Sequence, residues 1–153
     1  MNSLENRIPP PVLLLFVAIV MFITEWIFGP ISIEPIMRYS VIFVFFLVAL
    51  LLGPFAILAF RRNQTTIDPV HIERASKLVI SGPFRYSRNP MYTSMVALLI
   101  AWAFYLANPW AALGPILFAF YIWRFQIIPE ERAMRTKFGT DYQNYSRAVR
   151  RWI

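Results

Sequence analysis

The sequence contains no cysteine and only one histidine, His71. The absence of cysteine excludes disulfides, thiolate-bound metals and a cysteine nucleophile, and a single histidine argues against a histidine-based metal site. We therefore expect no metal centre. The chain also has no Walker-type phosphate loop, no dinucleotide glycine fingerprint, and no GxSxG or HExxH motif, which excludes a soluble nucleotide-binding fold.

Charged residues make up only 15% of the 153 residues, and 58% are hydrophobic. Four apolar runs reach or nearly reach the roughly 20 residues that a helix needs to cross a membrane. The sequence therefore predicts an all-α integral membrane protein with a single domain, residues 1–153. The first run lacks a small-x-small cleavage site, so we expect it to be retained. The predicted spans cover residues 11–28, 39–60, 91–107 and 110–128.

The net charge of +7 is unevenly distributed. Basic residues gather between the second and third runs and after the fourth, whereas the turn at Asn108–Pro109 is uncharged. The positive-inside rule then places both termini, the loop 61–90 and the tail 129–153 in the cytoplasm. Anionic lipid headgroups account for the basic residues, so we expect membrane lipid as a partner and no nucleic acid. The sequence does not indicate an oligomeric state.

The short connection at Asn108–Pro109 predicts that the third and fourth spans form an antiparallel helical hairpin. In such a hairpin the start of the third span and the end of the fourth lie on the same side of the membrane. The segments "RNPMY", 88–92, and "IIPEER", 127–132, should therefore face each other at the cytoplasmic interface.

The tail after Pro129 predicts two short helices separated by Gly139. "TDYQ", 140–143, has the pattern of a capping box that starts the second helix. That helix has an apolar face and a basic face, so we expect it to lie along the headgroups as an interfacial amphipathic helix. The apolar face would carry Tyr142, Tyr145, Val149 and Trp152, and the basic face Arg147, Arg150 and Arg151.

Glu130 and Glu131 are a candidate site with two interpretations. Acidic residues in the first turn of a helix stabilise its dipole, and this alone explains many such pairs. Opposite the pair, however, the hairpin places arginine, asparagine and tyrosine side chains, which together suit a zwitterion. Asn89, immediately before Pro90, equally fits a plain helix N-cap.

Two blocks of the sequence together resemble a known family. "LVISGPFRYSRNPMY", an uncharged hairpin, and then "EERAMRTKFGTDYQNYSRAVRRW" are similar to the isoprenylcysteine carboxyl methyltransferases and their relatives, the phospholipid N-methyltransferases. The chain would be a short bacterial-type member, and we expect it in the bacterial inner membrane. The resemblance implies a methyltransferase that uses S-adenosylmethionine, held at the cytoplasmic interface.

The resemblance also implies site residues. The cofactor would be held by Leu78, Val79, Phe84, Arg88, Asn89, Pro90, Met91, Tyr92, Glu130 and Glu131. Arg88, Asn89 and Glu131 would be catalytic, and Arg124 and Gln126 would contact the substrate. Phe84 stands where the eukaryotic enzymes have tyrosine, Asn89 where they have histidine, and Gln126 where they have an arginine linked to the substrate. Arg124, two residues earlier, could substitute for that arginine.

The acceptor implied by the resemblance is lipophilic, whether a small molecule or a prenylated substrate. A carboxylate such as isoprenylcysteine is already a nucleophile at neutral pH, whereas a phospholipid ammonium must first lose a proton to a base. The asparagine at position 89 therefore favours the carboxylate. Alternatives are methylation of a phospholipid amine or a small thiol, and a non-catalytic membrane anchor or assembly module. A sterol-type membrane reductase would need a nicotinamide site that the sequence does not contain.

Overall fold

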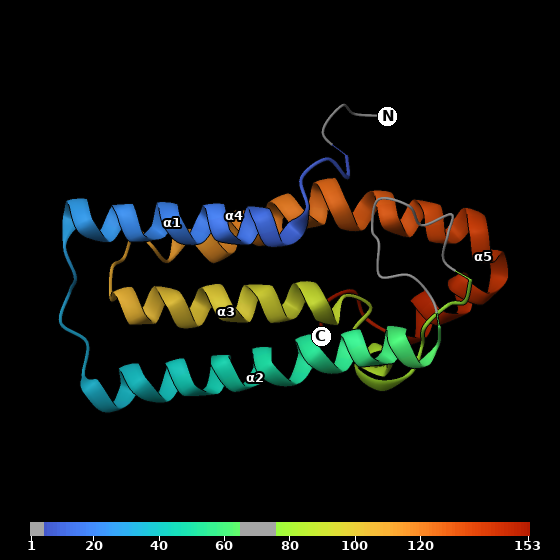
Figure 1. The fold of residues 1–153 in the computed structure, drawn as a ribbon, viewed down its shortest axis with the longest axis horizontal. Coiled ribbons are helices and arrows are strands. Elements are labelled where there is room, and N and C mark those ends of the chain that lie inside the picture. Colours follow the sequence, from blue (N-terminus) through green and yellow to red (C-terminus); the bar gives the residue numbers. More distant parts are fainter. Residues whose placement is uncertain (1–4, 65–75) are drawn as a thin grey trace.

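The computed structural model describes residues 5–64 and 76–153, and this part of the chain is helical and contains no strand (Figure 1). Residues 65–75 of the predicted loop 61–90, with His71, lie outside the described residues. The longer helices are α1 (Pro10–Phe28), α2 (Pro35–Arg62), α3 (Pro90–Leu106), α4 (Leu113–Ile122) and α5 (Ile128–Ala148). A 3₁₀ turn, η2 (Gly82–Arg85), precedes α3, and a π-helical turn, η3 (Trp123–Ile127), joins α4 to α5.

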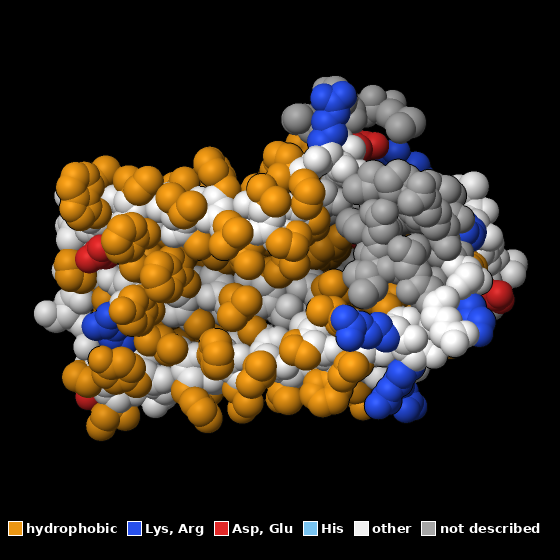
Figure 2. Space-filling model, viewed as in Figure 1, with side chains coloured by type: hydrophobic (Ala, Val, Ile, Leu, Met, Phe, Trp, Pro, Cys, Tyr) orange, Lys and Arg blue, Asp and Glu red, His pale blue; other side chains and the backbone are white. Residues whose placement is uncertain are grey.

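Helices α1 and α2 are each long and apolar enough to cross a membrane. Proline occupies the first turn of both, and α1 ends at Gly29, whose φ of +72° favours glycine. Few of their residues are buried, unlike those of a core helix in a soluble protein. Figure 2 shows hydrophobic side chains over most of one face, with many of the Lys and Arg side chains at the end where α5 lies. Helix α3 is also apolar but has 17 residues.

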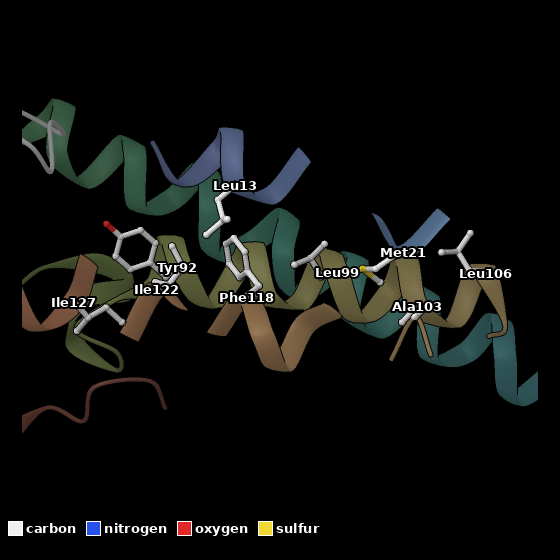
Figure 3. Close-up of a cluster of buried hydrophobic side chains, with 10 residues drawn as sticks. Leu13, Met21, Tyr92, Leu99, Ala103, Leu106, Phe118, Ile122 and Ile127 are labelled. Carbon is white, nitrogen blue, oxygen red and sulfur yellow. The ribbon is translucent and has the colours of Figure 1, made fainter. Parts of the chain in front are cut away.

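The interior is built around α3, which lies between α1 and α2 (Figure 1). Helix α2 packs along α3, and its buried residues, Ala49, Ala56 and Ala59, are all small. A side chain at Gly53 would lie 3.0 Å from the hydroxyl of Ser94, so glycine permits this close approach. On the other side α1, α3 and α4 share one apolar cluster (Figure 3). Its largest fully buried members are Met21, Leu99, Phe118, Ile122 and Ile127.

The turn between α3 and α4 is longer than the sequence predicts, and α4 starts at Leu113 rather than residue 110. Asn108 explains the difference, because its side-chain oxygen accepts hydrogen bonds from the backbone N–H groups of Trp110 (2.8 Å) and Ala111 (3.2 Å). Asn108 thus caps a tighter turn, in which the N–H of Ala112 donates to the main-chain oxygen of Pro109 and that of Leu113 to the oxygen of Trp110, before α4 begins. The predicted hairpin nevertheless forms, since α3 and α4 pack against each other.

From Leu113 the chain is helical through η3 to Ala148, with one interruption at Gly139 (φ +51°, ψ −121°). The predicted break at Gly139 is therefore confirmed. The predicted amphipathic face is wrong at its end, because the helix stops at Ala148 and Val149 is extended. The extended backbone turns Arg151 inward, away from the basic face that the helical pattern predicted, and Trp152 packs against the core cluster.

Candidate active site

The hairpin places Glu131 beside Arg88, as the sequence predicts. Glu131 lies in the first turn of α5, and Arg88 immediately precedes α3. The Arg88 Nη2 group donates a 2.7 Å hydrogen bond to Glu131 Oε1, and both side chains are largely buried. The other terminal nitrogen of Arg88 donates to the main-chain oxygens of Ser146 (2.6 Å) and Val149 (3.3 Å). Arg88 thus joins Glu131 to the end of α5.

A second arginine, Arg151, binds the same carboxylate in a bidentate manner. Its Nε donates to Glu131 Oε1 at 3.0 Å and its Nη2 donates to Oε2 at 2.7 Å. Burial alone would raise the pKa of Glu131, but hydrogen bonds from Arg151 and Arg88 and the charges of both outweigh it and leave the pKa below its usual value. Glu131 is therefore a buried, ionised carboxylate.

Glu130 has the opposite environment. Its carboxyl accepts a short hydrogen bond from the hydroxyl of Tyr92, in the first turn of α3. Burial raises the pKa of Glu130 to about 8, the hydrogen bond from Tyr92 opposes this, and the negative charge of Glu131 adds to it. Two neighbouring carboxyl groups thus differ in charge at neutral pH, because arginines surround only Glu131.

Asn89 occupies the N-cap position of α3, but its side chain does not cap the helix. Its amide instead donates a 2.9 Å hydrogen bond to the main-chain oxygen of Arg151. Pro90 is fully buried at the first position of the helix. The side chain of Asn89 therefore connects the start of α3 to the C-terminal segment.

The remaining predicted cofactor residues lie beside α2. Val79 and Phe84 are buried in a small cluster with Ala56 and Ala59, against which Met91 packs. The ring of Phe84 meets Phe60 edge-on, with 5.2 Å between centroids, and its main-chain oxygen accepts a 2.7 Å hydrogen bond from the Tyr145 hydroxyl. Leu78 is partly buried next to Val79. The segment 84–92 therefore contributes Phe84 and Met91 to this cluster and Arg88 to the ion pair with Glu131.

Arg124 and Gln126 lie on η3 and contact the N-terminal segment. Arg124 is 3.7 Å from Glu5, and the buried Gln126 side chain donates a 2.9 Å hydrogen bond to the main-chain oxygen of Ile8. The N–H of Asn6 donates a 3.1 Å bond to the main-chain oxygen of Phe125 within η3. The two predicted substrate residues thus belong to a π-helical turn, a helical irregularity that is frequent at functional sites.

Sequence reasoning missed Arg151 and the N-terminal segment as parts of this region. The only sequence signal for the position of Arg151 is the valine at position 149. A β-branched residue is less favourable in a helix than in an extended segment, and Val149 is extended in the structure. The carboxylate of Glu5 also lies 3.5 Å from the guanidinium of Arg132. No sequence pattern pairs Glu5 with Arg124 or Arg132, because these residues are more than a hundred positions apart in the chain.

The arrangement offers an ionised carboxylate, a carboxyl that stays largely protonated at neutral pH, and one unused donor. The Nε of Arg88 is buried and has no hydrogen-bond partner among the described residues. Buried polar groups normally have partners, so an unpaired guanidinium N–H indicates a place for an acceptor atom. The described residues contain no group of His, Asp and Glu that could hold a metal ion.

The described residues form a helical protein with a charged cluster at one end of its apolar helices. This cluster consists of Arg88, Tyr92, Glu130, Glu131 and Arg151. A sequence model of the family described as phospholipid methyltransferase matches residues 37–141, which include every residue of the cluster except Arg151. The chain belongs to this methyltransferase family, as the two sequence blocks predicted.

Curated relatives agree with this assignment. A rice protein named "Probable protein-S-isoprenylcysteine O-methyltransferase" is 30% identical over 61% of this chain, and Arabidopsis thaliana "Protein-S-isoprenylcysteine O-methyltransferase B" is 32% identical over 61%. The chain spans about half the length of these plant proteins, 49% and 48%. A Haemophilus influenzae protein named "Uncharacterized protein" is 44% identical over 41% of this chain and is matched over its whole length. No solved structure matches the chain.

Proposed function

We propose that this chain is an integral-membrane methyltransferase that uses S-adenosylmethionine and acts on a lipophilic acceptor at the cytoplasmic interface. The observation that carries the proposal is the cluster of Arg88, Glu130 and Glu131 at one end of helices whose long sides are apolar and exposed. A polar site at that position can meet a water-soluble cofactor and a lipid-soluble acceptor. Membership of the family supports the same chemistry.

In the membrane, α1, α2 and α3 would form three spans and α4 with η3 the fourth. The basic residues Arg61, Arg62 and Arg132 lie at the same end as the cluster, and by the positive-inside rule this end would face the cytoplasm. Both termini would then be cytoplasmic, the second part of α5 would lie along the headgroups, and the protein would reside in the bacterial inner membrane. Glu130 and Glu131 lie beyond the last span.

The residues present fit the anionic group of such a cofactor. When bound, S-adenosylmethionine supplies an electrophilic methyl group. The unpaired Nε of Arg88 suits an acceptor such as a carboxylate oxygen, and Glu131 holds that arginine in place. Leu78 and Val79 would contribute main-chain contacts, and Phe84 and Met91 apolar surface. The chain's own residues would thus bind, orient and shield the reacting groups, which is the main requirement of a displacement reaction.

The acceptor we propose is a carboxylate such as that of isoprenylcysteine. The names of the plant relatives support it, and so does chemistry, since a carboxylate attacks without prior deprotonation. Arg124, whose side chain is 35% exposed on η3, could orient such a carboxylate. The exposed apolar side chains of α4 would contact the prenyl chain.

The test is incubation of the purified full chain, in detergent or nanodiscs, with methyl-labelled S-adenosylmethionine and a panel of acceptors. The panel contains a prenylcysteine, phosphatidylethanolamine and a small hydrophobic thiol. We expect label in the prenylcysteine, and loss of labelling in Glu131→Gln but not in the exposed Arg85→Gln. Label in phosphatidylethanolamine or the thiol alone would correct the acceptor, and no label with no saturable cofactor binding would favour the anchor function.

A further inference from the structure

The C-terminal segment after α5 closes over the charged cluster through several specific contacts. The main-chain N–H of Arg88 donates a 3.0 Å hydrogen bond to the main-chain oxygen of Arg150. The side-chain amide of Asn89 donates a 2.9 Å hydrogen bond to the main-chain oxygen of Arg151. The ring of Trp152 packs against the apolar core. These contacts hold residues 149–152, the C-terminal latch, against the start of α3.

The latch presents one charged side chain to the cluster. Arg151 covers both oxygens of Glu131, whereas Arg88 reaches only Oε1. Bidentate pairing fixes the plane of a carboxylate as well as its position. Without Arg151, Glu131 would keep Arg88 as its single charged partner. Its Oε2 would lose the hydrogen bond from Arg151, and the carboxylate could rotate about its remaining contact.

We propose that Arg151 is a positioning residue of the active site: it fixes the carboxylate of Glu131, and through Glu131 the guanidinium of Arg88, in the geometry that receives the anionic group of the cofactor. This inference rests on the proposed function, and it assigns Asn89 the task of anchoring the latch. Arg151 acts through Glu131, because both of its hydrogen bonds described above go to that carboxylate, which also binds Arg88.

A first measurement tests the pairing without any ligand. Thermal unfolding of the full chain is followed from about pH 2 to pH 8 in one detergent for wild type, Arg151→Gln and Arg151→Lys, so that the scan extends below the depressed pKa of Glu131. Glu131 is ionised in the native protein, and its contribution to stability is lost as the pH falls through its depressed pKa. We expect Arg151→Gln to melt lower than wild type at pH 7 and the difference to close at acidic pH, where Glu131 is protonated in both proteins.

Arg151→Lys keeps the charge but not the bidentate geometry, so its melting temperature should be intermediate at pH 7. Arg147→Gln removes the same charge from an exposed position on α5 and should follow the wild-type curve. A melting difference for Arg151→Gln that is equal at every pH would overturn the proposal, because it would reflect lost packing alone.

A second measurement uses S-adenosylhomocysteine as the probe in a binding titration at pH 7. We expect Arg151→Gln to weaken binding about tenfold, as for the loss of one charge-assisted contact, with partial recovery in Arg151→Lys and none of this effect in Arg147→Gln. If wild type binds and Arg151→Gln binds equally, the positioning role is overturned. If wild type itself does not bind, the proposed function fails, while the ligand-free melting curves still decide whether Arg151 controls Glu131.

Discussion

Arg88 and Glu131 lie 2.7 Å apart although 43 residues separate them in the chain. The hairpin of α3 and α4 returns the chain to its starting side, and the π-helical turn η3 leads directly into the helix that carries Glu131. The same arginine donates hydrogen bonds to two main-chain oxygens at the end of α5, those of Ser146 and Val149. One side chain therefore connects the site to the fold of the tail.

Replacing Arg88 by glutamine should destabilise the protein. The variant leaves Glu131 with Arg151 as its remaining charged partner and removes the donors to the oxygens of Ser146 and Val149. Breaking a buried ion pair costs about 3 kcal/mol when the remaining charge is left without a partner, and the loss should be smaller here because Arg151 still pairs with Glu131. We expect a lower melting temperature in detergent, and Arg85→Gln, at an exposed position, should change it little. Equal melting temperatures for both variants would contradict the role of Arg88 in the fold.

Glu130 should make stability fall with rising pH. Its pKa is about 8 in the native protein against an ordinary value of 4.5, so folding favours the neutral carboxyl. This contribution is complete below about pH 4.5 and is lost as the pH rises through about 8. Glu130→Gln, which is neutral at every pH, should lack this decline. The measurement is the difference in melting temperature between variant and wild type, which should grow from about pH 5 and level off above about pH 8.

A flat difference across that range would mean that Glu130 is ionised throughout, as an ordinary helix-start glutamate would be. Glu131 changes stability in the opposite direction, because its ionised form is the favoured one and its contribution is lost as the pH falls. Comparison with Glu131→Gln therefore separates the effects of the two carboxyl groups. That variant should differ most from wild type at neutral pH.

Removing the hydroxyl of Tyr92 should alter Glu130 in a defined direction. The hydrogen bond from Tyr92 lowers the pKa of Glu130, so Tyr92→Phe should raise that pKa and extend the pH-dependent decline in stability above pH 8. Losing the partner of a buried polar group should also cost about 1–3 kcal/mol. Tyr86→Phe serves as the control, because Tyr86 is 77% exposed. An unchanged pH profile in Tyr92→Phe would show that the hydroxyl does not act on Glu130.

The sequence predicted that the segments of Arg88 and Glu131 face each other, because this arrangement depends on local signals. Apolar runs, one uncharged turn and two prolines determine where the helices begin and which ends meet. The predicted bounds of the first three apolar helices differ from the observed ones by a few residues at most. These features follow from hydrophobicity and helix chemistry within short windows of the chain.

The latch was not predictable in the same way. Helical periodicity places Arg151 on an outer basic face, and only the extended backbone at Val149 reverses its direction. That backbone is stabilised by distant partners, Arg88, Asn89 and the apolar core around Trp152. Likewise, the contact of Gln126 with Ile8 spans 118 residues. Tertiary contacts of this kind leave no periodic trace in the sequence.

The packing of α1 on α4 gives a prediction that does not involve the site. An added Cβ at Gly114 would lie 2.6 Å from the Cγ of Met21 and 3.3 Å from a methyl group of Val17. Met21 is only 2% exposed, so its side chain has little room to move away. Gly114→Ala should therefore lower stability by about 1–3 kcal/mol through overpacking.

Met21→Ala should also be destabilising, by about 2–5 kcal/mol, because it leaves a cavity. In the double variant, Gly114→Ala with Met21→Ala, the added methyl group occupies part of the space that the methionine vacates. The two changes should then cost less together than the sum of their separate effects, since residues in direct contact are not additive. The measurement is a double-mutant cycle of unfolding in detergent, and strictly additive effects would show that α1 does not pack on α4 through this pair.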